Sequence, residues 1–578
     1  MTQLVAYALP GVPYGCVYAL MAVGLVLTYK ASGVFNLAFG AQAYVSAIVF
    51  YVAVRAGWPR WAAFVVAVVV LGPALGLVLD RALFRFTRTS PPLVKLVPAL
   101  GLLVAIPSAT QMIFGTGQRQ SPPAVLLDPT HVYAHLGGVA LNGEELATTA
   151  VTLAVVAALA AMFRTSGLGL QMRAVVESPR LTELAGIRAD RVGAYAWMLS
   201  SLLAGLAGTL LAPIYADLSA ANFTALLVAS IAAAAVGGFD SLPLTLAGGI
   251  ALGVGQEIIG GYLPSGTILS SGLRPAFPFL VLAVLLVARP TFHRARPVAD
   301  PLAACDPPPR SHQPPPRMPV VARGTRAFTG ALVVSLVVVA LAAVPGNWTY
   351  TLTQGLVLAV IFLSITLLTG LGGQISLSQG TFAGVGAFAV GQLAERFSTP
   401  VLVGMAAGAL LAAAIGAVLA VLALRLHGIA LALLTLSFAL LADNVLFAYS
   451  WAGNGASGLT VPRPTLAGLS FTGDGAFFWL ALALLVVTAG AVRLLQGGTT
   501  GGELAALRGS ERAAQAIVAD LVAEGYVERT RVGRRNHYRI AMDRELRHPL
   551  ERSHRIDELL ALATPEPERV RAAPARGR

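Results

Sequence analysis

Two segments of the chain place polar side chains inside stretches that are otherwise apolar. Residues 33–47 read GVFNLAFGAQAYVSA, and residues 370–390 read GLGGQISLSQGTFAGVGAFAV. Amides and hydroxyls are expensive in hydrocarbon, so they must face protein or a water-filled cavity. Amides and hydroxyls in such a position can recognise a solute by hydrogen bonding. The residues concerned are Asn36, Gly40 and Gln42 in the first segment, and Gln374, Ser376, Ser378 and Gln379 in the second.

Either segment taken alone fits ordinary packing, in which glycines let helices approach and polar groups bond between helices. The two segments, however, occupy matching places in the two halves of the chain. Glycine-rich interruptions at corresponding places are typical of helices that line a transport site. We therefore predict that these residues line a translocation pathway.

A polar loop at residues 164–191 mixes apolar and charged residues at helical spacing. Gly186 stands where such a helix would end, because glycine accepts the left-handed cap at little cost. A short amphipathic helix of this kind can place its apolar ridge in a groove on a partner. An ordinary solvated loop is the alternative interpretation.

Catalytic and metal-binding patterns are not found in the sequence. It contains no Walker A loop, no H-E-x-x-H, no C-x-x-C and no Ser/His/Asp arrangement. We therefore expect no enzyme activity, no catalytic residue, no metal site and no cofactor bound by this chain. Three ionisable residues fall in or near apolar runs, and a lone carboxylate there is a candidate for function; they are Lys95, Glu257 and Asp443.

The composition identifies the elements that position these residues. Of the 578 residues, 56 % are hydrophobic and only 12 % are charged, and the mean hydropathy is +0.74. Soluble chains carry about 25 % charged residues. The sequence therefore predicts an all-α polytopic membrane protein. Its apolar spans lie near 4–28, 33–54, 61–80, 93–114, 146–163, 193–214, 222–238, 243–262, 273–288, 327–344, 351–370, 375–393, 400–424, 428–449 and 476–495.

The net charge of +13 is concentrated in short segments between spans and in two polar stretches, 289–326 and 493–578. Positive residues in loops mark the cytoplasmic side. This rule places the N-terminus outside, and the linker and C-terminal tail on the cytoplasmic side.

The two halves look like divergent copies of one unit. We predict a first unit at 1–290, a Pro/Arg-rich linker at 291–326 and a second unit at 327–510. The second unit is shorter, because about four spans follow the polar loop of the first unit and none follow residues 501–517 in the second.

Each half resembles a permease subunit of the branched-chain amino-acid ABC importers. In the first half the matching segments are GLVLTYKASGVFNLAFGAQAY (24–44), GLGLQMRAVVESPRLTELAGI (167–187), LLAGLAGTLLAP (202–213), AVGGFDSLPLTLAGGIALGVGQE (235–257) and RPAFPFLVLAVLLVARP (274–290). The second half is similar to the partner permease, through LTGLGGQISLSQGTFAGVGAFAV (368–390), LRLHGIALALLTLSFALLADN (424–444), GNGASGLTVPRP (453–464) and GGELAALRGSERAAQAI (501–517). Here the two subunits look fused.

This resemblance implies a place in a bacterial cell (inner) membrane and the rest of an importer. Two cytoplasmic ATPases would bind and hydrolyse ATP, and a solute-binding protein would deliver leucine, isoleucine, valine, or a related solute such as urea or a short amide. The resemblance also implies that the two polar loops couple to the ATPases. The coupling residues would be Arg173, Glu177, Glu183 and Gly186 in the first loop, and Arg508, Ser510, Glu511 and Arg512 in the second.

From residue 511 onward the chain resembles part of a winged helix-turn-helix regulator. We expect a helix at 511–525, strands at 526–530 and 536–540, and a basic turn at 531–535. This fragment would extend over 511–562, and a disordered tail over 563–578. DNA contacts, if the fragment binds DNA, would be Arg529, Arg531, Arg534 and Arg535.

The sequence thus predicts a permease component driven by partner ATPases. Two alternatives remain open. One is a membrane-tethered regulator that binds DNA through the tail, although the modest basic excess there makes nucleic acid an unfavoured partner. The other is a non-functional chimera.

Overall fold

The computed structural model describes residues 2–32, 35–87, 92–115, 122–125, 132–136, 139–177, 179–215, 217–239, 241–264, 268–289, 346–424, 426, 428–449, 459–466, 469–497, 527–532 and 535–540. These belong to two compact units. One unit holds residues 1–369 and 374–488, and the other holds 370–373 and 489–578.

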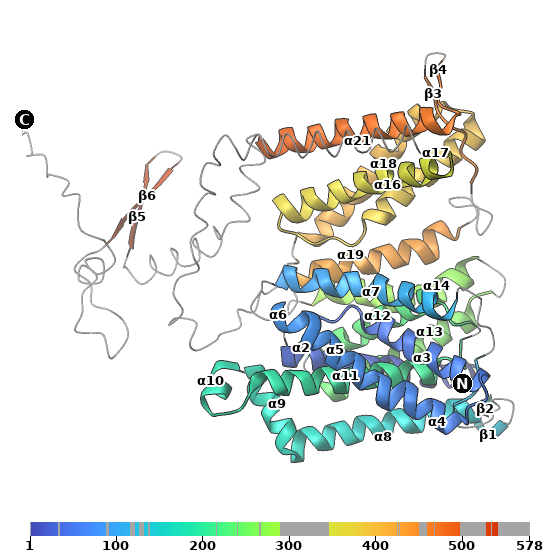
Figure 1. The fold of residues 1–578 in the computed structure, drawn as a ribbon, viewed down its shortest axis with the longest axis vertical. Helices are drawn as coiled ribbons and strands as arrows, with labels where there is room; N and C mark the ends of the chain where they lie inside the picture. Colours follow the sequence, from blue (N-terminus) through green and yellow to red (C-terminus); the bar gives the residue numbers. More distant parts are fainter. Residues whose placement is uncertain are drawn as a thin grey trace, which may run out of the picture. The chain divides into compact units, whose positions relative to one another are not determined.

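The first half of the chain is a bundle of helices, one of which, the continuous helix Arg60–Thr87, contains two π-helical turns (Figure 1). Its elements are α1 (Thr2–Ala8), α2 (Gly11–Ser32), α3 (Phe39–Arg55), α4 (Arg60–Phe64), η1 (Val65–Val70), α5 (Leu71–Leu79), η2 (Asp80–Phe84), α6 (Arg85–Thr87), α7 (Pro92–Phe114), β1 (Val132–Leu136), β2 (Val139–Asn142), α8 (Gly143–Thr165), α9 (Gly167–Glu177), α10 (Pro179–Leu184), α11 (Ala189–Leu211), α12 (Ala220–Val236), α13 (Leu242–Tyr262) and α14 (Ile268–Ala288).

The second half repeats the beginning of this order. Its elements are α16 (Gly346–Ile365), η5 (Thr366–Leu371), α17 (Gln379–Phe397), α18 (Val401–Ala423), α19 (Ile429–Leu441), η6 (Ala442–Phe447), β3 (Thr465–Leu466), β4 (Leu469–Ser470) and α21 (Asp474–Gly497). In both halves a short antiparallel hairpin, β1–β2 or β3–β4, precedes a long helix, α8 or α21. Within the described residues, α11 to α14 have no counterparts in the second half.

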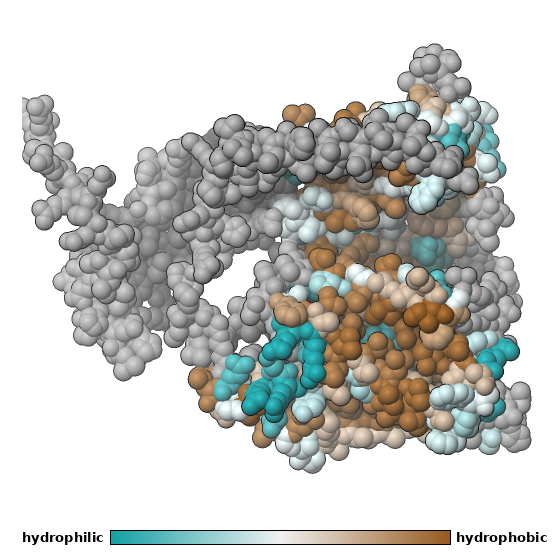
Figure 2. Space-filling model, viewed as in Figure 1, coloured by the Kyte–Doolittle hydropathy of each residue, from teal (hydrophilic) through white to brown (hydrophobic). Residues whose placement is uncertain are grey.

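The membrane character predicted from composition is confirmed. Ten of the described helices are long and apolar enough to span a bilayer. Figure 2 shows the side of the bundle that carries α3 to α8 as mostly hydrophobic, with hydrophilic residues gathered at its ends. Every predicted span coincides with a helix, apart from 327–344, which lies outside the described residues.

Helix α2 forms the centre of the first half and packs on α8, α11, α12 and α13. Glycines set its distance from α13. A Cβ added at Gly253 would lie 2.3 Å from the Gly15 nitrogen, and one added at Gly249 would lie 2.7 Å from the Ala19 nitrogen. Small residues at helix interfaces allow this backbone approach inside membranes.

Helix α14 joins the two halves, because it packs on α12 and α13 of the first half and on α19 and η6 of the second. At Gly272 the approach is close, since an added Cβ would lie 2.4 Å from the Asn444 carbonyl oxygen. Asp443, noted above as an intramembrane carboxylate, belongs to the same π-helical turn of the second half.

The second unit contains one described hairpin, β5 (Val527–Val532) with β6 (Arg535–Ile540). The predicted strands are confirmed, but the predicted turn at 531–535 is too wide. Pairing continues to Val532 opposite Arg535, so Arg531 and Arg535 belong to strands. Antiparallel strands need only a two-residue connection, which permits this longer ladder.

Candidate functional site

The polar loop at 164–191 folds as two short helices, α9 and α10, between the long helices α8 and α11. Gly186 ends α10 as predicted, with φ of +84°. The Gly186 N–H donates to the Glu183 carbonyl at 2.9 Å, and the Ile187 N–H donates to the Thr182 carbonyl at 3.1 Å. This pair of bonds is a Schellman cap, which requires the left-handed conformation that glycine tolerates.

Helix α9 rests on the bundle through an apolar face. Met172 and Val175 of α9 are buried against Leu27 of α2 and against Val192 and Ala196 of α11. Any displacement of α9 is therefore transmitted to two long helices, one of which is the central helix of the first half.

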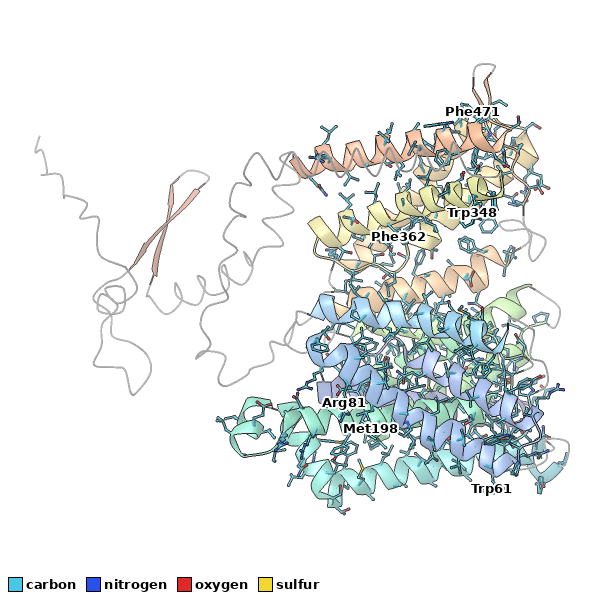
Figure 3. All side chains as sticks on the ribbon, viewed as in Figure 1. Trp61, Arg81, Met198, Trp348, Phe362 and Phe471 are labelled. Atoms are coloured by element: carbon cyan, nitrogen blue, oxygen red, sulfur yellow. The ribbon has the colours of Figure 1, made fainter. Side chains whose placement is uncertain are left out.

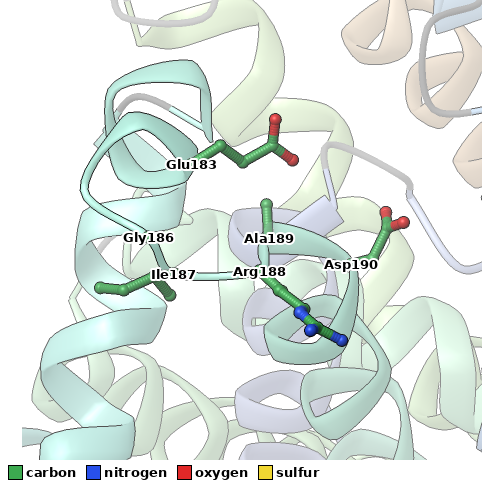
Figure 4. Close-up of a pocket in the computed structure, with 6 residues that line it drawn as sticks. All are labelled: Glu183, Gly186, Ile187, Arg188, Ala189 and Asp190. Carbon is green, nitrogen blue, oxygen red and sulfur yellow. The ribbon is translucent and has the colours of Figure 1, made fainter.

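The opposite side of this loop is open. Leu170, Leu181 and Leu184 are exposed, the last with 78 % of its surface accessible. A shallow hollow lies beside them (Figure 4), lined by Glu183, Gly186, Ile187, Arg188, Ala189 and Asp190. Exposed leucines among charges form a surface suited to a protein partner.

The structure places three of the predicted coupling residues at this surface, one of which is Gly186 beside the hollow. Arg173 is exposed on α9 and Glu183 is exposed on α10. The backbone of Glu177 ends α9, while its side chain lies outside the described part. Arg508, Ser510, Glu511 and Arg512 of the second loop also lie outside the described residues.

The first predicted pathway segment is an irregular stretch before α3. Asn36 is fully buried, and its Oδ1 accepts from the Ala38 N–H at 3.1 Å. Gln42, one turn into α3, is also buried, and its Oε1 accepts from the Ser201 hydroxyl of α11 at 2.8 Å. Among the described residues, neither Asn36 Nδ2 nor Gln42 Nε2 has a hydrogen-bond partner. Two amide donors without a partner in the described ranges thus lie inside the bundle.

Gly40 serves packing in the structure. A Cβ there would lie 2.4 Å from the carbonyl oxygen of Phe223 on α12. The sequence predicts Gly40 as a pathway residue, and the close approach of α12 is a separate reason for a glycine at this position.

The second pathway segment also precedes a helix, α17. Ser378 and Ser376 are buried, with hydroxyl oxygens 3.0 Å apart. The intervening Leu377 N–H donates to the Thr435 hydroxyl of α19 at 2.9 Å. Gln379 is half-buried and Gln374 is exposed, so the two serines are the buried members of the four predicted pathway residues here.

An ion pair joins α13 to α14 and was not predicted. One Arg274 nitrogen donates to both carboxylate oxygens of Glu257, at 2.7 and 2.6 Å. The sequence indicated Glu257 as a candidate functional carboxylate but did not indicate its partner, because Arg274 lies on the next helix. Nearby, the Tyr18 hydroxyl donates to Gln256 Oε1 at 2.8 Å, so α2, α13 and α14 share a polar cluster.

Of the arginines predicted as DNA contacts, Arg529 and Arg531 lie on β5 and Arg535 begins β6. Arg534 and the predicted helix at 511–525 are outside the described residues. No group of three His, Cys, Asp or Glu side chains in the described ranges could hold a metal ion.

Comparison with known proteins places this geometry in context. The sequence profile of the family described as "Branched-chain amino acid transport system / permease component" matches residues 8–288 and again residues 347–519. No solved protein structure matches the chain.

Relatives with established names match over about one half of the chain. The high-affinity branched-chain amino acid transport system permease protein LivH of Escherichia coli (strain K12) is 27 % identical over 300 residues, which is 50 % of this chain and 95 % of that protein. The corresponding BraD protein of Pseudomonas aeruginosa is 24 % identical, with the same coverage of each chain. A probable LivH of Methanocaldococcus jannaschii is 27 % identical over 44 % of this chain and 80 % of that protein.

Proposed function

This chain belongs to the family of permease components of branched-chain amino acid transport systems, and we propose that it moves leucine, isoleucine and valine, or a related small solute such as urea or a short amide, into the cell. The observation that carries the proposal is the double match of the family profile to a helical bundle built for the membrane. The proposal includes the fusion of two permease units, at 1–290 and 327–510, through the linker at 291–326.

In this proposal the energy comes from two ATPase subunits that bind and hydrolyse ATP. One would dock on α9 and α10, where Leu170, Leu181 and Leu184 are exposed. The other would dock on the second loop, at Arg508, Ser510, Glu511 and Arg512. Because α9 is seated on α2 and α11, a pull on the loop would move the centre of the first unit, as alternating access requires.

The proposed orientation puts α9 and α10 in the cytoplasm and the N-terminus outside, where a solute-binding protein would deliver its cargo. Support comes from the distribution of arginine. Arg164 lies in the last turn of α8, and Arg173, Arg188 and Arg191 follow it, all near the end of the bundle that carries α10. Arg81, at the same end, is labelled in Figure 3. Lys and Arg in short loops favour the cytoplasmic side.

The translocation pathway would use the polar groups of the two irregular segments. Asn36 and Gln42 supply buried amides, and Ser376 and Ser378 supply buried hydroxyls. Gln374 and Gln379 would stand at the edge of the same path. The tail would be a winged-helix-like fragment at 511–562 followed by 563–578; its β5–β6 hairpin supports this assignment.

Uptake of labelled leucine by cells of the source organism tests the function. Deleting the gene should abolish ATP-dependent uptake, and restoring the intact gene should recover it. Restoring a gene that lacks the codons for residues 167–187 should not recover uptake. Leu184→Arg should block uptake by placing a charge on the docking surface, and Leu184→Met should preserve it as the matched control. Full uptake by the 167–187 deletion would disprove the coupling role.

Competition by unlabelled isoleucine, valine, urea and acetamide then identifies the solute class. Suppression by the two amino acids alone supports a branched-chain substrate. Suppression by urea or acetamide alone would assign the chain to the amide-type solutes instead.

A further inference from the structure

The central helix of the first half and its counterpart in the second half differ sharply in their surroundings. In the helix spanning Gln3–Lys30, 89 % of the most apolar window is buried, whereas the value is 6 % for Trp348–Gly370. Helix α2 owes its burial to α8, α11, α12 and α13. Helix α16 packs on α17, and the described residues supply no equivalents of α11 to α13.

The register between the halves follows from their helix starts. Helix α3 begins at Phe39 and α17 begins at Gln379, each after an irregular polar segment. Equivalent positions are therefore 340 residues apart. This register pairs Leu37 with Leu377 and Asn36 with Ser376, which occupy the same places in the two segments.

Glycines fall at equivalent positions in the two halves. Gly15 of α2 touches α13, where an added Cβ would lie 2.5 Å from the Ile250 Cα, and Gly40 touches α12 at Phe223. Their equivalents are Gly355 and Gly380. At both of these a Cβ would meet nothing within 4 Å among the described atoms.

An alanine in the first half packs closely on α11 and has an exposed alanine as its equivalent in the second half. The backbone of Ala43 on α3 lies against Gly208 of α11, whose added Cβ would be 2.3 Å from the Ala43 oxygen. Its equivalent, Ala383, is exposed on α17. Small residues that meet α11, α12 and α13 in the first half are thus kept in the second half, on a face with no described neighbour.

Larger side chains on this face are exposed too. Val357, Leu358 and Phe362 are each about half exposed, while their equivalents Val17, Tyr18 and Ala22 are buried. Figure 3 labels Phe362 on α16. We call the surface formed by Gly355, Leu358, Phe362, Gly380 and Ala383 the docking face.

We propose that the docking face binds a separate membrane polypeptide whose helices are equivalent to α11–α14, so that two chains together complete the second permease unit. The tail of this chain cannot supply these helices, because residues 493–578 contain sixteen arginines and twelve acidic residues. A bilayer does not tolerate such a density of charge.

Two other occupants fit the face less well. A second copy of this chain already uses its α11, α12 and α13 to cover its own α2 and α3. Lipid would have to cover Gln354, which is exposed on α16, and an amide facing hydrocarbon is unfavourable. A separate polypeptide can approach the small residues of the face closely and can bond the Gln354 amide.

Photocrosslinking in membranes of the source organism tests the proposal. The full chain carries p-benzoylphenylalanine in place of Leu358, and a control carries it in place of Leu410, which is exposed on α18. Both sites are exposed, so neither substitution disturbs folding. Cross-linked peptides are sequenced by mass spectrometry.

The proposal predicts an adduct at position 358 whose peptide comes from another polypeptide that aligns with residues 189–288. This adduct should be lost in a Gly355→Leu background and should not form at position 410. An adduct only to peptides of this chain would overturn the proposal in favour of self-association or internal contact. Equal absence of protein adducts at both positions would overturn it in favour of lipid. Leucine uptake can persist in either case, so the proposed function is tested separately.

Discussion

Matched glycine substitutions in the two halves give a quantitative test of the packing described above. Gly40 and Gly380 each stand second in their helices, α3 and α17. An alanine methyl group at Gly40 would lie 2.4 Å from the Phe223 carbonyl oxygen, while at Gly380 it would meet nothing within 4 Å of the described atoms. The same change is therefore made in a closed site and in an open one.

The magnitudes follow from these distances. An ordinary contact is no shorter than 3.4 Å, so the Gly40→Ala methyl must push α3 and α12 apart by about 1 Å. Overpacking of this kind costs roughly 1–3 kcal/mol, and the helix preference of alanine over glycine returns at most about 1 kcal/mol. Gly40→Ala should lower the free energy of unfolding by about 1–2 kcal/mol, whereas Gly380→Ala should raise it slightly.

Thermal unfolding of the purified chain in detergent measures both effects. Cys16 is fully buried, so a thiol-reactive dye reports its exposure in a Cys305→Ser background. The apparent Tm should fall by about 1–2 °C for Gly40→Ala, given the size of the chain, and stay level or rise for Gly380→Ala. An equal Tm shift for the two variants would refute the packing argument.

Further predictions concern other buried contacts. Ser201→Ala should destabilise the chain by about 1–3 kcal/mol, because the Gln42 Oε1 loses the hydroxyl that donates to it; an unchanged Tm would show that the bond contributes nothing. Glu257→Gln and Arg274→Gln should each lower the Tm, and the double variant should lower it less than the sum, because each single change leaves the other charge in the bundle without its partner; strict additivity would contradict this. Burial raises the pKa of Tyr215, which lies between α11 and α12. The phenol is therefore favoured neutral in the folded state, so its contribution to stability is complete below the ordinary tyrosine pKa of about 10 and is lost as the pH rises above it. Tyr215→Phe should weaken the alkaline loss of Tm, and an identical pH profile would disprove the effect.

Much of the fold could be predicted because membrane spans are recognised from the apolar composition of long segments. A run of apolar residues long enough to span the bilayer must form a helix, since backbone groups have no water to bond. The starts of α3 and α17 could not be placed in this way. The apolar runs extend over residues 35–38 and 375–378, where the chain is irregular and its polar groups bond locally.

Burial was easier to expect from the sequence than contacts were, although Gln374 of the second segment is exposed. The burial of Asn36, Gln42, Ser376 and Ser378 agrees with the expectation that polar groups in apolar spans face protein. The Glu257–Arg274 pair was missed because it forms between helices, and spacing along the chain carries no signal for it. Gly186 was recognised because its requirement is local, a left-handed residue at a helix end.

The sequence indicated how many spans the second half lacks, but it could not indicate which surface is left uncovered. Which surface lacks neighbours depends on how α2 meets α11, α12 and α13, and that arrangement appears only in three dimensions. Once the contacts are known, the equivalence of Gly15 with Gly355 and of Gly40 with Gly380 identifies the face.

The central claim is that this chain forms a solute path driven by separate ATPases. The most direct test is leucine accumulation by right-side-out membrane vesicles of the source organism that contain trapped ATP and are supplied with the solute-binding protein on the outside. Vesicles with the intact chain should accumulate leucine only when ATP is present, and vesicles with Leu184→Arg should not accumulate it. Accumulation without ATP, or equal accumulation in vesicles that lack the chain, would contradict the account.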